Sequence, residues 1–175
     1  PISVYGKTKL LGEKEIFYFH DNFIIFRVSW LCGSDKANFI TKMLELGLVN
    51  KNLKIISDQI GRPTFTHDFS KVLFKIIKKY NFKKKYKDIY HYSSSGKELS
   101  WYEFAQKIFK FAKKYGYLKP NLIAISSRSF KSPAKRPKYS CLDINKALKE
   151  FKLSKVNLNE SLQMTINQIL SKKGY

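Results

Sequence analysis

The sequence predicts an α/β fold, and two observations lead to this prediction. Short apolar runs alternate along the chain with longer segments whose apolar residues recur at helical spacing. The apolar runs are mostly continuous, as is typical of parallel strands covered on both faces. A nucleotide-binding α/β domain normally carries a Gly-rich turn after a strand, and neither GxGxxG nor GxxxxGK[ST] occurs here. We therefore expect the later part of a larger fold.

Residue spacing and capping signals place the elements of the first half of the chain. We expect a helix at about 3–19, a strand at 23–30 buried on both faces, a helix at 34–48, a short strand at 53–57, a loop at 58–67, and a helix from Asp68 to about 79. Ser34 or Asp35 is the expected N-cap of the second helix. The third helix is expected to bury Val72, Leu73, Ile76 and Ile77.

The second half of the chain continues the same alternation. We expect a strand at 88–96 that runs into a loop, a helix at 100–116, a strand at 122–126, a proline-containing loop at 129–140, and helices at about 143–151 and 159–171. The helix from residue 100 has the clearest signals. Ser100 and Glu103 form a capping box, and Gly116 suits the position after its end.

Length and composition limit the class of protein. The chain has 175 residues, 43% of them apolar, which suits one domain or one domain with a small lobe. No apolar run approaches the roughly 20 residues that span a bilayer, and the start does not resemble a signal peptide. Cys32 and Cys141 lie far apart without metal-ligand spacing. We expect a cytoplasmic protein that neither binds zinc nor inserts into a membrane.

The formal net charge of +21 raises the question of a nucleic-acid partner. Nearly all of this charge is lysine, whereas base readout and bidentate phosphate contacts favour arginine. The lysines are also spread over expected helix faces, as in KIIKKYNFKKKYKD at 75–88. These details favour solvated lysine faces over a nucleic-acid site. An anionic small substrate would still be attracted by such a field.

Tyr5 and Lys9 form a candidate acid–base pair. Positions i and i+4 share one face of a helix, so both side chains are expected to point the same way. A free phenol has a pKa of about 10, and a nearby ammonium stabilises its phenolate form. A tyrosine in such a setting can protonate a carbonyl oxygen. The spacing alone is a weak signal, because YNFKK at 80–84 repeats it in this Lys- and Tyr-rich chain.

The residues around this pair resemble a known family. PISVYGKTKLLGE at 1–13 is similar to the active-site helix of extended short-chain dehydrogenases/reductases, P-x-x-x-Y-G-x-[ST]-K-x-x-G-E. Further blocks resemble one branch, the dTDP-4-dehydrorhamnose reductases. They are FRVSWLCG (26–33), NFITKML (38–44), DQIGRPT (58–64), IYHYSSSGKELSWYEFAQKIF (89–109) and SPAKRPKYSCLD (132–143). The blocks keep the family's order and cover nearly the whole chain.

The resemblance implies a fold and a division of the chain. It implies the C-terminal part of an NAD(P)-binding Rossmann fold with a small α/β substrate-binding lobe. Residues 1–33 and about 65–95 would belong to the Rossmann domain, and about 34–64 and 96–175 to the lobe. The N-terminal cofactor-binding half, with the Gly-rich turn and the third catalytic residue, a Ser or Thr, would be absent from this chain.

The resemblance also implies roles for particular residues. Tyr5 would be the general acid, and Lys9 would tune it and hold the nicotinamide ribose. The cofactor would be NADPH or NADH, contacted by Tyr5, Lys9, Val28 and Ser29. The substrate-binding candidates are Trp30, Asn38, Phe39, Gln59, Arg62, Thr64 and Arg136. Each of these seven has an open alternative as a core, cap, turn or surface residue. The histidines (His20, His67 and His91) are expected to be structural or surface residues.

The implied activity is reduction of the C4 ketone of dTDP-4-dehydro-L-rhamnose to dTDP-L-rhamnose. The partners would be the dTDP-sugar and the missing N-terminal half, and a homodimer is left open. No acidic cluster demands magnesium or another metal. One alternative is a non-catalytic regulatory or nucleotide-sugar-binding relative of the same fold, like the regulatory subunit of methionine adenosyltransferase. Another is that these 175 residues are inactive alone.

Overall fold

Parallel strand pairs organise the molecule, and the α/β prediction is confirmed. The computed structural model describes residues 1–79, 85–117, 120–130 and 134–172. The parallel pairs are β1 (Phe23–Val28) with β6 (Lys87–Tyr92), β2 (Leu31–Cys32) with β5 (Thr64–Phe65), and β3 (Asn52–Ile56) with β8 (Asn121–Ile125). The short strands β4 (Ile60–Gly61) and β7 (Leu99–Ser100) pair antiparallel. Helical crossovers join partners of parallel pairs, as such pairs require.

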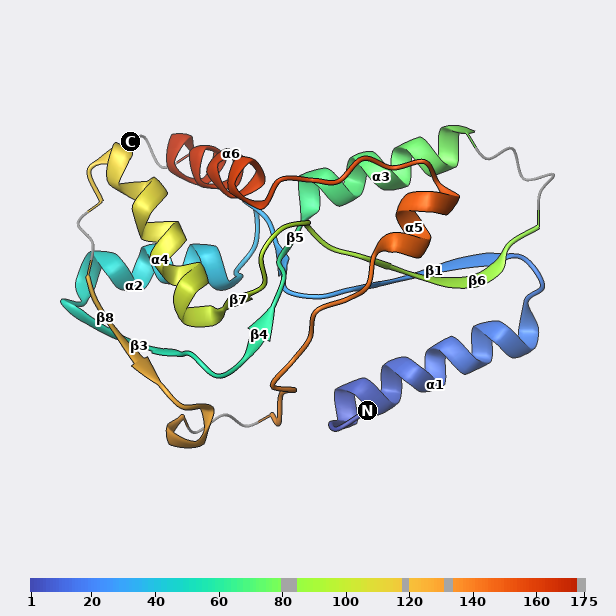
Figure 1. Cartoon of the computed structure of the whole chain (residues 1–175), viewed down its shortest axis with the longest axis horizontal. Helices are drawn as coiled ribbons and strands as arrows, with labels where there is room; N and C mark the ends of the chain where they lie inside the picture. The colour runs from blue at the N-terminus through green and yellow to red at the C-terminus, as the bar shows by residue number, and fades with distance from the viewer. Residues whose placement is uncertain (80–84, 118–119, 131–133, 173–175) are drawn as a thin grey trace.

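The helices lie in two groups (Figure 1). They are α1 (Val4–Phe19), α2 (Phe39–Val49), α3 (Thr66–Lys79), α4 (Trp101–Ala112), α5 (Asn145–Glu150) and α6 (Leu158–Ser171), with 3₁₀ turns η1 (Lys113–Tyr115) and η2 (Ser127–Ser129). α3 and α5 lie on one side of the β1–β6 pair and α1 lies on the other. α2, α4 and α6 gather with β3 and β8 at the opposite end of the molecule.

Two buried clusters correspond to these two groups. The sheet core, around β6, α3 and α5, consists of Val72, Ile76, Tyr86, Tyr90, Tyr92, Ala147 and Phe151. The lobe core, around α2, α4 and α6, is larger, and its fully buried members include Ile40, Leu44, Phe104, Ile108, Phe109, Leu162 and Ile166. The domain boundaries expected from the sequence stay a prediction.

Local capping chemistry explains where two helices begin. The predicted capping box of α4 is confirmed, since the Glu103 backbone N–H donates to Ser100 Oγ and the Ser100 N–H donates to Glu103 Oε2. Gly116, with φ 77°, follows η1 as expected. The predicted cap of α2 is wrong. Asn38, not Ser34 or Asp35, caps this helix, and its Oδ1 accepts from the Ile40 N–H.

Other expectations for strands and helices also need correction. β1 ends at Val28, not at residue 30, and its residues are half-buried or exposed because only β6 pairs with it among the described residues. α3 begins at Thr66, and Asp68 in its first turn accepts from Ser161 Oγ. Leu73 and Ile77 are exposed because α3 buries only the narrow stripe of Val72 and Ile76.

An ion pair links α1 to the strand that follows it. The Arg27 guanidinium donates through Nε to Glu13 Oε1 at 2.8 Å and through Nη2 to Oε2. This hydrogen bond with Arg27 lowers the pKa of Glu13 from its ordinary value. None of the residues of α1 is buried, so we expect this pair to matter for the position of the helix.

Glu13→Gln is expected to destabilise the seating of α1 by about 1 kcal/mol, since a partly exposed bidentate pair is worth little more. The pKa of Glu13 is lowered on folding, so its contribution is complete above pH 4.5 and is lost as the pH falls below that value. Hydrogen exchange of the α1 amides at pH 7 and pH 3 measures both effects. Glu15→Gln is the matched control, and equal exchange in the two variants would contradict the prediction.

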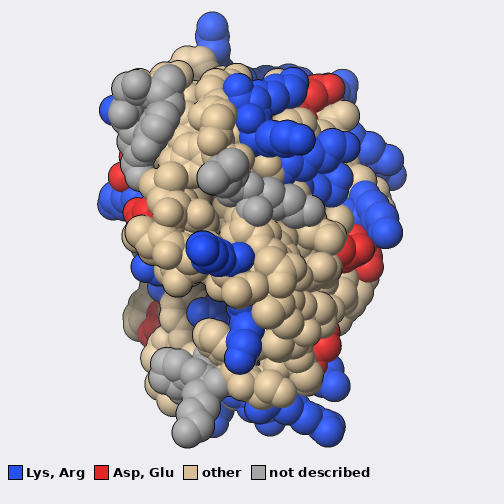
Figure 2. Space-filling view, turned by 90° about the vertical axis from the view of Figure 1, so that its left-hand side faces the viewer, with Lys and Arg blue, Asp and Glu red and all other residues tan. Residues whose placement is uncertain are grey.

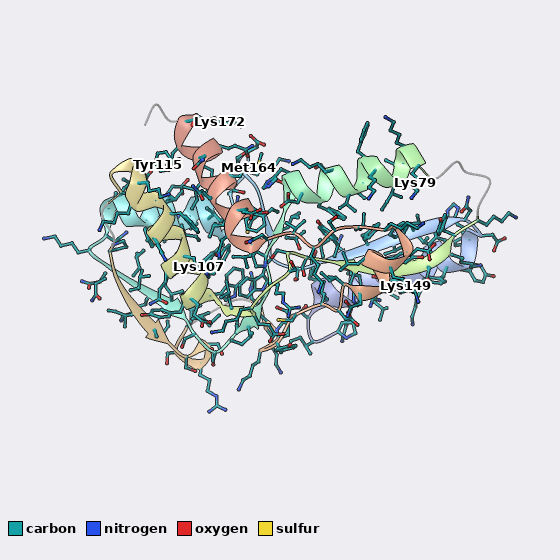
Figure 3. All side chains as sticks on the ribbon, turned by 45° about the horizontal axis from the view of Figure 1, so that its top comes forward. Lys79, Lys107, Tyr115, Lys149, Met164 and Lys172 are labelled. Carbon is teal, nitrogen blue, oxygen red and sulfur yellow. The ribbon has the colours of Figure 1, made fainter. Side chains whose placement is uncertain are left out.

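Lys and Arg side chains outnumber acidic ones on the face drawn in Figure 2. They are densest in the upper right part of that view, and others lie singly toward its lower edge. Lys79, Lys107 and Lys149 come from α3, α4 and α5 respectively (Figure 3). In the described part of the chain, no helix has the length and apolarity needed to cross a bilayer.

Candidate active site

Tyr5 and Lys9 lie together at the start of α1. Ser3 caps the helix by accepting the Gly6 N–H through Oγ at 3.2 Å, so the first helical turn presents Tyr5. Lys9 Nζ lies 5.5 Å from the centroid of the Tyr5 ring. The Tyr5 side chain is 72% exposed, so its hydroxyl is accessible. The second Tyr-x-x-x-Lys run, at 80–84, lies outside the described residues.

The chain turns sharply at Trp30. This residue has φ 48°, a left-handed conformation that is costly for a bulky side chain. Its carbonyl accepts from the Thr64 backbone N–H at 3.0 Å and from Cys32 Sγ at 3.3 Å. These contacts hold the turn that ends β1 and starts β2. Such strain at a strand end is common where a side chain must be aimed at a ligand.

The Trp30 indole is fixed between two neighbours. It stacks on Trp101 with a centroid distance of 3.4 Å and an interplanar angle of 8°. Its other neighbour is Gly61, where an added Cβ would lie 2.4 Å from Trp30 Cε2. The indole Nε1 donates to Ser140 Oγ at 3.1 Å. Phe39 extends this aromatic group, with its ring 4.5 Å from that of Trp101.

Hydrogen bonds join three further candidates to the Trp30 turn. Ser29 Oγ donates to the Arg62 carbonyl at 3.0 Å, and Thr64 Oγ1 donates to the Ser29 carbonyl at 2.7 Å. The Arg62 guanidinium donates to the Gly96 carbonyl and pairs with Glu98 at 3.2 Å. Thr64 is fully buried, which favours a structural contribution over substrate contact.

The remaining candidates differ in their surroundings. Asn38 Nδ2 donates to the Gly33 carbonyl at 2.6 Å, in addition to its capping role, so this side chain is already committed. Gln59 is buried beside β4, and Val28 pairs with Tyr92 at the end of β1. Arg136 is exposed and lies three residues before Tyr139, which forms a β-bridge with Ile60 of β4. Within the described ranges, Arg136 forms no ion pair.

The candidates therefore form two groups. Tyr5 and Lys9 make the first, while Ser29, Trp30, Phe39, Arg62 and Thr64 are joined into the second by the contacts above. Across the described residues, no hydrogen bond, ion pair or ring contact connects the two groups. α1 runs below the strands, with its N-terminal end toward the middle of the molecule (Figure 1).

Comparisons with known proteins decide the family. The model of the RmlD substrate binding domain matches residues 1–171. The chain belongs to this family. A dTDP-4-dehydrorhamnose reductase of Aggregatibacter actinomycetemcomitans is 35% identical over 154 residues, which are 86% of this chain and 52% of that protein. The chain thus spans about half the length of such relatives.

Solved structures of the RmlD family agree with the fold. A dTDP-4-dehydrorhamnose reductase from Clostridium acetobutylicum superposes with a TM-score of 0.84 at 34% identity, covering 97% of this chain and 57% of that one. The enzyme from Bacillus anthracis, crystallised with NADP, gives a TM-score of 0.82 at 32% identity, covering 96% and 56%.

Sequence reasoning missed several residues that build the second group. Trp101, Glu98, Tyr139 and Ser140 lie in blocks that carry the family resemblance, yet no role was assigned to them. Tyr139 Oη donates to Glu98 Oε1 at 2.5 Å, which raises the pKa of Tyr139 to about 12. The SWYEFA run was the available signal, because an aromatic residue at a helix start beside a capping box is well placed to pack on a neighbouring strand end.

The described residues fit one end of a nicotinamide cofactor. The exposed Tyr5 hydroxyl and the Lys9 ammonium beside it are hydrogen-bond donors that could contact the nicotinamide ribose. The sequence has no Gly-rich turn to receive the diphosphate. The described residues contain no group of three or more His, Cys, Asp or Glu that could hold a metal ion.

Burial lowers the pKa of His67, which lies beside Asp68.

Proposed function

We propose that this chain is the substrate-side half of an NAD(P)H-dependent dTDP-4-dehydrorhamnose reductase. The reaction converts the C4 ketone of dTDP-4-dehydro-L-rhamnose into the alcohol of dTDP-L-rhamnose. The observation that carries the proposal is the adjacent, accessible Tyr5 and Lys9 at the start of α1 in a chain of the RmlD family.

The proposed chemistry divides between cofactor and chain. Bound NADPH or NADH would supply the hydride to the C4 carbon. Tyr5 donates its phenolic proton to the C4 oxygen as negative charge develops there. The Lys9 ammonium, 5.5 Å from the Tyr5 ring centroid, stabilises the phenolate that remains. Val28 and Ser29, at the end of β1, lie where parallel sheets place ligands.

The second group is proposed to bind the nucleotide sugar. Trp30, Trp101 and Phe39 present an aromatic surface, and Arg136 can bind a diphosphate through two parallel hydrogen bonds. Asn38 and Thr64 already use their side chains for backbone hydrogen bonds, so their contribution is to shape the site. Gln59 and Arg62 support it from the segment around β4.

The test is turnover by the complete protein. Oxidation of NADPH and of NADH is followed with dTDP-4-dehydrorhamnose as substrate, and dTDP-L-rhamnose is identified as the product. Turnover of the dTDP-sugar supports the proposal. Binding of dTDP without turnover would instead support the alternative, a non-catalytic nucleotide-sugar-binding relative.

The preceding half of such a protein is the proposed partner of α1 and β1. α1 exposes Val4, Tyr18 and Phe19, and none of its residues is buried. β1 has β6 as its sheet partner among the described strands, which leaves one edge open. Open edges and apolar faces are normally covered in stable proteins.

Residues 1–175 expressed alone are expected to aggregate or to bind a hydrophobic dye, because α1 and the β1 edge are uncovered. Co-expression with the preceding half from a relative in this family is expected to yield a soluble complex. Size-exclusion chromatography with light scattering measures both outcomes. A monodisperse, dye-free preparation of the 175 residues would contradict this proposal.

A further inference from the structure

One carboxylate oxygen joins three separate segments of the chain. Glu98 Oε1 accepts from Tyr139 Oη at 2.5 Å and from Arg62 Nη2 at 3.2 Å. Glu98 itself lies just before β7, Arg62 follows β4, and Tyr139 lies in the loop that leads toward α5. All three residues lie outside helices, and both hydrogen bonds to Glu98 come from side chains of other segments.

Backbone hydrogen bonds extend the same arrangement. The Ile60 N–H donates to the Lys138 carbonyl at 2.7 Å, and the Ser140 N–H donates to the Ile60 carbonyl at 2.9 Å. Residues 138–140 therefore lie beside β4 like a short added strand, while β7 pairs with the other edge of β4. Ser140 also receives the Trp30 indole hydrogen bond. The position of this segment thus affects the aromatic surface directly.

The two arginines on the segments that Glu98 joins, Arg62 and Arg136, differ in the contacts that they form. Arg62 uses Nε for the Gly96 carbonyl and Nη2 for Glu98, so its guanidinium is largely occupied. Arg136 is exposed and, among the described residues, has no carboxylate partner. It lies three residues before Tyr139 on the same segment. The hydrogen bond to Glu98 raises the pKa of Tyr139 to about 12, because the carboxylate accepts from the protonated phenol.

We propose that Glu98 is a positioning residue that holds the 134–140 segment through Tyr139 and thereby places Arg136 against the diphosphate of the nucleotide sugar. Glu98 does not touch the substrate in this proposal. Arg62 serves as the structural partner of Glu98, and Arg136 is the arginine that reads the diphosphate. The inference rests on the proposed function, because it assigns the arginine of that same site.

The binding test uses dTDP and the complete protein. Glu98→Gln keeps the size of the side chain but removes its charge, which weakens both contacts. We expect the Kd for dTDP and the KM for the dTDP-sugar to rise about 10-fold while kcat stays within about twofold. Tyr139→Phe is expected to raise the Kd and the KM in the same way and to leave kcat nearly unchanged. The double variant should be no worse than Glu98→Gln alone, because that change already weakens the connection to Tyr139.

A second readout does not depend on the ligand. Trypsin can cleave after Lys135 and Lys138 but not after Arg136, which precedes Pro137. Release of this segment from Glu98 is expected to speed cleavage at these two bonds several-fold in both variants. Glu45→Gln, on the exposed side of α2, is the matched control and should change neither cleavage nor binding.

Unchanged cleavage and unchanged dTDP affinity in Glu98→Gln would overturn the positioning role. An additive double variant would overturn the shared connection through Tyr139. A wild-type protein that neither binds dTDP nor turns over the sugar would overturn the proposed function and this inference with it. Wild-type binding combined with a normal Glu98→Gln variant would overturn the inference alone, so the two failures are distinguishable.

Discussion

Replacing Tyr5 with phenylalanine is expected to lower kcat of the complete protein about 1,000-fold, since a positioned general acid typically contributes between 100- and 10,000-fold. The Kd for dTDP should stay within about twofold, because the substitution removes only a hydroxyl that acts on the ketone. The side chain is exposed, so the change should leave the thermal unfolding midpoint unaltered. Stopped-flow measurement of NADPH oxidation, with calorimetry for dTDP, separates the two effects.

Tyr18→Phe is the matched control for this experiment. Tyr18 lies on the same helix and is 82% exposed, so the same hydroxyl is removed without touching the proposed acid. Lys9→Met is expected to lower kcat as well, whereas Lys7→Met should not. Full turnover by the Tyr5→Phe protein would exclude Tyr5 as the general acid.

Gly61→Ala is expected to produce the second large effect. An alanine Cβ would lie 2.4 Å from Trp30 Cε2, and Trp30 cannot move away freely because it stacks on Trp101 at 3.4 Å. Overpacking of this kind costs about 2 kcal/mol. A shift of the indole by about 1 Å also misplaces the proposed sugar surface, so we expect kcat/KM to fall about 100-fold.

The matched control for Gly61→Ala is Gly12→Ala. An added Cβ at Gly12 meets no atom within 4 Å, and the residue lies inside α1. This control is expected to gain up to about 1 kcal/mol from helix propensity. Denaturant unfolding and steady-state kinetics of both variants provide the comparison. Wild-type stability and activity in Gly61→Ala would show that the Trp30 position tolerates movement and matters little to the site.

Local signals in the sequence predicted what local chemistry determines. The Ser100 and Glu103 capping box is confirmed because both partners lie within one helical turn. The cap of α2 was misplaced because Ser34, Asp35 and Asn38 are all capable caps. Asn38 is the cap in the structure, where its amide also donates to the carbonyls of Gly33 and Lys36. Those carbonyls belong to a turn that the sequence pattern does not reveal.

Long-range packing set the limits of prediction at the candidate site. The strand expected to reach residue 30 ends at Val28 because the backbone turns left-handed at Trp30. That turn depends on Thr64 and Trp101, which are distant in sequence. The adjacency of Tyr5 and Lys9 required only helical spacing and was predictable. The connection of Arg62, Glu98 and Tyr139 involves three remote segments, and no spacing rule reports it.

The path of the chain between its two cores has a consequence for protein engineering. The buried residues between positions 32 and 65 belong to the lobe core, and those of α3 and β6, with Tyr86, belong to the sheet core. Those between positions 99 and 117 belong to the lobe core again. Ala147 and Phe151 then return to the sheet core, and α6 returns to the lobe core. No single cut separates the two. A chimaera that exchanges the lobe between relatives must therefore match junctions at every crossing, and a contiguous graft would split both interiors.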